Sequence, residues 1–181
     1  MGVDIAGNLN YASRLTLAIT LIGAAMHDVS PILAVKRWSA ILDYEAAVNV
    51  ILMNSIGRDD VPLEDAFLEH GFLGSLRPFS GLREENFLQV MEAIIALRPH
   101  LQDKKVWDAR LIEALWELTS TARLWALDPN GMLQRNRLLS EADAALLLRW
   151  VQCIELAVRR LFRGGDPRQA LAYYRGEDVD A

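Results

Sequence analysis

A carboxylate and an amide stand one helical turn apart in a strongly apolar stretch of this sequence. Glu45 and Asn49 lie among tryptophan, leucine, isoleucine and valine residues, and an i, i+4 spacing on a helix lets two side chains touch. A carboxylate in apolar surroundings is costly unless it is hydrogen-bonded, paired or protonated. With Trp38, these residues form a candidate ligand site between helices, although a structural hydrogen bond to a helix end, or a side chain that extends to solvent, is the simpler explanation of Glu45.

Other arrangements of catalytic or metal-binding residues are missing from the sequence. His27, His70 and His100 each fall near a different expected helix end, and no HExxH or ExxH spacing places two metal ligands on one helical face. There is also no phosphate-binding glycine loop and no GxSxG elbow. Cys153 has no histidine nearby in the sequence to act as its base, which favours a packed thiol. The sequence therefore predicts no metal and no cofactor.

An arginine cluster on the helix expected up to Phe162 is the strongest candidate interaction surface. At 100° per residue, Arg149, Arg159, Arg160 and Arg163 fall opposite the apolar face of that helix. The apolar face comprises Trp150, Ile154, Ala157, Val158 and Leu161. One interpretation is an ordinary solvated face, on which Glu155 pairs with Arg159 and the last cations stabilise the helix dipole. The other is a docking site for an acidic protein or a phosphate-bearing ligand.

The helix expected over Lys104–Leu127 carries apolar residues on two sides. One stripe contains Trp107, Leu111, Ala114, Leu118, Ala122 and Trp125, whereas Trp116 and Leu127 point to nearly the opposite side. A helix with two apolar sides either contacts two layers or exposes a patch that meets a partner. We therefore expect Trp116 to belong to an interaction surface together with the arginines.

Composition indicates one globular domain over residues 1–181, with a short acidic tail from about residue 176. The chain has 181 residues, of which 52% are hydrophobic and 24% charged, and a net charge of −5. This modest negative charge makes nucleic-acid binding an unfavoured alternative, although residues 135–175 carry eight arginines. The apolar run Leu15–Met26 is shorter than the ~20 residues that span a bilayer and lacks the basic lead-in of a secretion signal. We expect a cytoplasmic protein without a membrane partner.

Breaker and capping residues divide the chain into helices, with no convincing alternating strand. The expected helices are Asn10–His27, Pro31–Ser55, Pro62–His70, Arg83–Leu97, Lys104–Leu127, Ser140–Phe162 and Asp166–Tyr174. In this prediction Asp103 and Ser140 cap two of the helices, and Pro99 helps to end another. The fold class is therefore all-α, a single-domain bundle of five to seven helices. The second helix is apolar almost all round, so we expect it to be largely buried and central.

The expected function follows from the exposed apolar and cationic side chains and from the missing catalytic motifs. A non-enzymatic protein that acts through protein–protein interaction fits best, for example a bacterial-type regulator, adaptor or neutraliser, either with a different protein or as a homodimer. The alternative is an enzyme or a small-molecule-binding domain with an interhelical site around Glu45 and Asn49.

Overall fold

A computed structural model describes residues 42–55, 70–102, 104 and 106–177, all of which belong to one compact unit over residues 42–181. These residues form helices and connecting loops without a β-strand, so the fold class is all-α as predicted. The helices are α3 (Tyr44–Asn54), α5 (Glu84–Leu101), α6 (Ala109–Ala122), α7 (Met132–Arg135), α8 (Glu141–Phe162) and α9 (Arg168–Arg175). Within this part of the chain, no helix combines the length and the apolar character needed to cross a bilayer.

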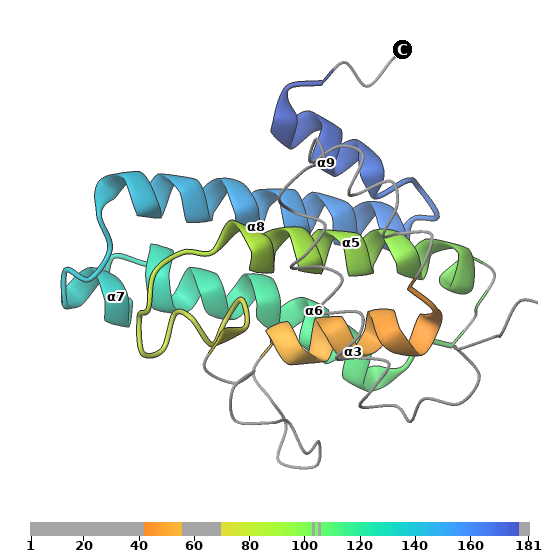
Figure 1. The fold of residues 1–181 in the computed structure, drawn as a ribbon, viewed down its shortest axis with the longest axis horizontal. Helices are drawn as coiled ribbons and strands as arrows, with labels where there is room; N and C mark the ends of the chain where they lie inside the picture. Colours follow the sequence, from red (N-terminus) through yellow and green to blue (C-terminus); the bar gives the residue numbers. More distant parts are fainter. Residues whose placement is uncertain (1–41, 56–69, 103, 105, 178–181) are drawn as a thin grey trace, which may run out of the picture. The chain divides into compact units, whose positions relative to one another are not determined.

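Four of these helices pack in ring order, with α3 against α5, α5 against α8, α8 against α6 and α6 against α3 (Figure 1). The central buried helix is α5, in which the five consecutive residues from Ala93 to Leu97 are all buried. Five consecutive residues cover every side of a helix, so α5 is enclosed all round. The second helix of the chain, expected to be largely buried, is described only over α3, where Ala47, Val48, Ile51, Leu52 and Asn54 are buried and Glu45 is exposed.

The prediction of one continuous helix over Pro31–Ser55 is wrong at Asp43. Asp43 has an extended backbone, and its Oδ1 accepts a hydrogen bond of 2.8 Å from the Ala46 amide. An aspartate in this geometry is an N-cap, so α3 begins at Tyr44. Residues 31–41 lie outside the described part of the chain, as do the expected helix Asn10–His27 and nearly all of Pro62–His70.

Two other helix ends differ from the prediction. Helix α6 begins at Ala109 and not at Lys104, because the Asp108 side chain caps it by accepting a hydrogen bond from the Arg110 amide. Helix α5 continues through Pro99 to Leu101. A proline removes the donor to the carbonyl four residues earlier, and in the last turn only one such bond is lost. The predicted Ser140 cap of α8 is confirmed, because its Oγ accepts a bond of 3.0 Å from the Asp143 amide.

Buried asparagines fix the irregular segment between residues 70 and 81 onto the helices. Asn54, at the end of α3, accepts a hydrogen bond of 2.9 Å from the Phe72 amide through its side-chain oxygen. Asn86 of α5 donates from its side-chain nitrogen to the His70 carbonyl at 2.6 Å. Because an unpaired buried amide is costly, these partners position the segment precisely against α3 and α5.

An aromatic cluster connects α5, α8 and α9. The Trp150 indole of α8 stacks on Phe87 of α5 with ring centroids 5.3 Å apart and planes 5° from parallel. Its Nε1 donates a hydrogen bond of 2.9 Å to the Tyr174 hydroxyl of α9, and the Tyr174 ring lies 5.0 Å from Phe87. The indole is only 2% exposed, so it is shared among three helices of the core.

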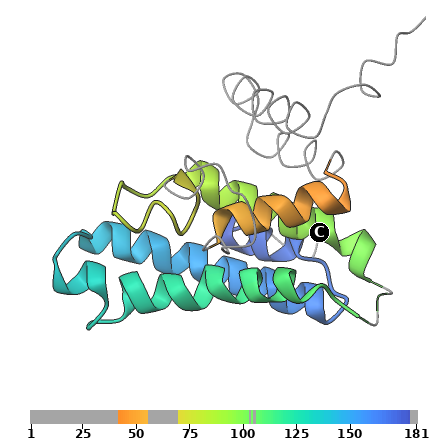
Figure 2. The same ribbon diagram turned by 90° about the horizontal axis from the view of Figure 1, so that it is seen from below.

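Helix α6 ends in a π-helical turn, Arg123–Leu127, before the chain reverses into α7 and α8. Gly131 lies against this turn, since a Cβ there would be 2.5 Å from the Leu124 carbonyl oxygen and 2.7 Å from that of Trp125. Backbone atoms this close exclude any side chain. The reversal brings α6 and α8 side by side, as both views show (Figures 1 and 2).

Candidate functional site: a groove between α6 and α8

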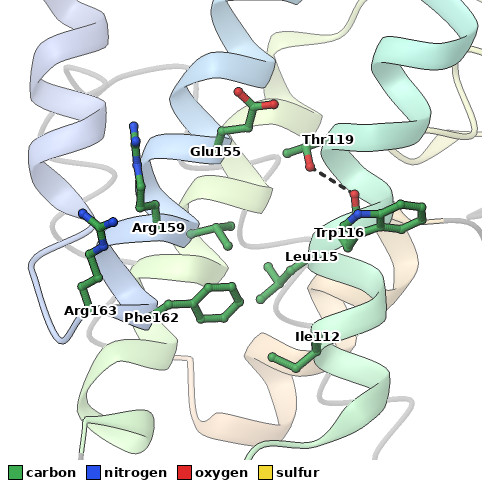
Figure 3. A pocket seen from close by; sticks show the side chains of 9 residues that line it. Ile112, Leu115, Trp116, Thr119, Glu155, Arg159, Phe162 and Arg163 are labelled. Atoms are coloured by element: carbon green, nitrogen blue, oxygen red, sulfur yellow. Dashed lines mark hydrogen bonds between the residues drawn. The ribbon is translucent and has the colours of Figure 1, made fainter.

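An apolar groove of about 380 Å³ lies between α6 and α8 (Figure 3). It is lined by Ile112, Leu115, Trp116 and Thr119 of α6 and by Glu155, Val158, Arg159, Phe162 and Arg163 at the end of α8. Leu115 is buried, whereas Trp116 is 67%, Phe162 49% and Ile112 38% exposed. Large apolar side chains exposed together mark interaction surfaces more often than isolated ones do.

Helical periodicity builds both walls of this groove. On α6 the lining positions follow the spacing i, i+3, i+4 and i+7 from Ile112, and on α8 they follow the same spacing from Glu155, with Arg163 added directly after the helix end. Residues with this spacing lie on one face of a helix. In Figure 3, Leu115 and Phe162 point toward the space between the helices, with Arg159 and Arg163 on the α8 side. Each helix therefore contributes a stripe two turns long.

The Glu155 carboxylate at the groove is held by Arg123 of the π-helical turn. Nε and Nη2 of Arg123 each donate a hydrogen bond of 2.7 Å, one to each carboxylate oxygen. This bidentate bond raises the pKa of the Arg123 guanidinium. The predicted pairing of Glu155 with Arg159 is wrong, because the turn at the end of α6 brings another arginine to this carboxylate.

The predicted arginine surface divides into two pairs. Arg149 donates to the Tyr174 carbonyl oxygen at 3.3 Å and lies over the Tyr174 ring, while Arg160 donates to the side-chain oxygen of Gln169. Both therefore contact α9. Among the described residues, the guanidinium groups of Arg159 and Arg163 have no hydrogen-bond or ion-pair partner, and both line the groove on its α8 side, across from Trp116 of α6 (Figure 3). The exposed position predicted for Trp116 is confirmed.

The surroundings expected for Glu45 are different in the structure. Its side chain is exposed and Asn49 is half-buried, while Trp38 lies outside the described residues. Because α3 begins at Tyr44, Glu45 stands in the first helical turn, where a carboxylate interacts favourably with the helix dipole. The exposed position agrees with the simpler explanation, a side chain that extends to solvent, and not with a carboxylate enclosed by apolar side chains. A ligand-binding role for Trp38, Glu45 and Asn49 stays a prediction that has lost its original physical reason.

Two titratable groups whose pKa values are raised lie elsewhere, around α9: the buried Cys153 and the half-buried Glu92. The Cys153 Sγ is 3.4 Å from the Ala170 carbonyl oxygen, and burial raises the pKa of this thiol to about 12. A thiol in that state is packed and unreactive, as predicted. Glu92 of α5 was missed by the sequence reasoning. Burial raises the pKa of its carboxyl group to about 7, and Arg175 opposes that rise. The sequence signal that could have identified Glu92 is its position as the one acidic residue in the apolar run FLQVMEAIIAL.

The raised pKa of Glu92 predicts how stability depends on pH. An unfolded glutamate titrates near pH 4.5, so between about pH 4.5 and about 7 the folded chain binds more protons and its stability falls as the pH rises. We expect Glu92→Gln to raise the free energy of unfolding by about 2 kcal/mol at pH 8, less than the full pKa difference implies because water screens this half-buried group, and to change it little at pH 4.5. Urea unfolding at both pH values measures this difference. The control is Glu85→Gln, an exposed acid of the same helix, and a gain at Glu92 that is equal at both pH values would contradict the prediction.

Comparison of the chain with known protein families, with curated proteins and with solved structures gives no significant match. Function is therefore inferred from the groove and its chemistry.

Proposed function

We propose that this protein is non-enzymatic and acts by binding another protein through the α6–α8 groove. One observation carries the proposal: the exposed Trp116 borders an apolar hollow together with two unpaired guanidinium groups among the described residues. Tryptophan and arginine are the residue types that contribute most to protein–protein affinity. An apolar centre with a charged rim is also the usual anatomy of such an interface.

The occupant is a polypeptide that places apolar side chains in the groove and carboxylates beside Arg159 and Arg163, which form the rim of the groove on the α8 side. Burial of Trp116, Phe162 and Ile112 supplies apolar contact area, and Arg159 with Arg163 supplies charge complementarity. The role that fits is a cytoplasmic regulator, adaptor or neutraliser of that protein. An enzymatic site at Glu45 is less well supported, because that side chain is exposed in the first turn of α3.

Site-specific photocross-linking tests the proposal in the native host. A photoreactive benzophenone amino acid replaces Trp116, and the matched control replaces Tyr173 of α9, which is 74% exposed and does not line the groove. We expect one adduct with a different protein from position 116 and none of that adduct from position 173. The captured protein is then purified and bound to the wild-type chain, which must form a complex with it.

Three outcomes would contradict the proposal. The same adducts from both positions would show non-specific capture. An adduct between two copies of this chain would make a homodimer the occupant of the groove. A cross-link within one chain would show that its own residues cover Trp116.

A further inference from the structure

We infer that the partner segment in the groove is an acidic amphipathic helix. This inference rests on the proposed function and names the class of polypeptide that the groove accepts. Its two parts, the helical form and the negative charge, come from separate observations.

The shape of the groove selects a helix. The lining residues of α6 run from Ile112 to Thr119 and those of α8 from Glu155 to Phe162, two turns on each helix, which is about 10 Å of helix axis. The hollow between two adjacent helices is the place where a third helix packs its apolar face. A partner helix would insert apolar side chains at i, i+3 or i+4 and i+7, the usual spacing of helix-in-groove recognition.

The charge at the rim selects acidic residues. Arg159, in the last turn of α8, and Arg163, the residue that caps its C-terminal end, are four positions apart, and both guanidinium groups lack a partner among the residues described. The nearby carboxylate of Glu155 is occupied by its bidentate bonds to Arg123, so it does not compensate them. Two carboxylates at i and i+4 on a partner helix have the same spacing as these arginines. Each can therefore meet one guanidinium in a charge-assisted hydrogen bond.

Synthetic helical peptides test the inference directly. Three 18-residue peptides share one leucine face at i, i+4 and i+7 and differ only in the flanking positions, which carry Glu, Gln or Lys. Fluorescence anisotropy of the labelled peptides gives each dissociation constant. We expect the Glu peptide to bind at least about 10-fold tighter than the Gln peptide, and its affinity to fall with salt. The double variant Arg159→Glu/Arg163→Glu should reverse the preference and bind the Lys peptide best.

A second double variant controls for net charge. Arg135→Glu/Arg168→Glu makes the same change of charge at exposed arginines that do not line the groove, and it should keep the preference for the Glu peptide. Circular dichroism checks that both double variants are folded. A preference that reverses equally in the control variant would overturn the inference, because net charge alone would then explain it.

The remaining outcomes separate this inference from the proposed function. If the Glu and Lys peptides bind equally and Trp116→Ala weakens both, the groove binds proteins but does not select acidic helices. If no peptide binds at 0.5 mM, the helical acidic ligand is wrong, and cross-linking at position 116 decides the proposed function separately. A single-stranded oligonucleotide that displaces the Glu peptide would reassign the arginines to polyanion binding and overturn the inference.

Discussion

Trp150→Ala should lower the free energy of unfolding by about 4 kcal/mol. The truncation removes an almost fully buried indole that stacks on Phe87 and donates to the Tyr174 hydroxyl. It leaves a cavity where α5, α8 and α9 meet. The packed helices on both sides limit how far neighbouring side chains can move in to fill this cavity. Urea unfolding measures the effect as a lower transition midpoint at an unchanged slope.

Two conservative variants separate packing from hydrogen bonding at this position. Trp150→Phe keeps an aromatic ring but loses the Nε1 donor, and Tyr174→Phe removes only the acceptor hydroxyl. We expect Tyr174→Phe to cost about 1 kcal/mol and Trp150→Phe more than that but less than the alanine variant. A loss of less than about 1 kcal/mol for Trp150→Ala would contradict the central packing of this indole.

Trp116→Ala should weaken binding of the partner and of the Glu peptide by about 2 kcal/mol or more, roughly 30-fold in the dissociation constant. The indole borders the groove and two-thirds of it is exposed, so it is available to a partner but contributes little to the core. We therefore expect the free energy of unfolding to change by less than about 0.5 kcal/mol. Isothermal titration calorimetry and urea unfolding on the same protein preparation measure the two quantities.

Tyr173→Ala is the matched control for this prediction. Tyr173 is another exposed aromatic residue, but it lies on α9 and does not line the groove. Its truncation should change the affinity less than about twofold, within the range of a neutral surface substitution. Equal weakening by both substitutions, or unfolding of Trp116→Ala, would contradict the assignment of Trp116 to a binding surface.

Local patterns in the sequence predict the helical class and much of the surface chemistry. The Ser140 cap, the buried face of α8 around Trp150 and the exposed position of Trp116 all depend on residues within a few turns of one another. Helical periodicity and capping chemistry act over that range. The same reasoning predicted a packed Cys153, which the structure confirms.

Features that depend on tertiary contacts were not predictable in the same way. The Asp43 cap, by contrast, is a local signal that the apolar pattern outweighed in the prediction, and the start of α3 at Tyr44 changes the expected environment of Glu45. Glu155 pairs with Arg123, which is 32 positions away in the sequence. The i, i+4 spacing on the helix predicts Arg159 instead, because it considers neighbours on the same helix only. The contacts of Arg149 and Arg160 with α9 likewise require the packed position of that helix.

Mapping the contact surface by nuclear magnetic resonance tests the central claim most directly. The ¹⁵N-labelled chain is titrated with the purified partner that is captured at position 116. We predict that the indole N–H signal of Trp116 and the amide signals over residues 112–119 and 155–163 shift, while the buried Trp150 indole signal does not. Shifts confined to α9 or to α3, with the Trp116 signal unchanged, would contradict the claim that the α6–α8 groove binds the partner.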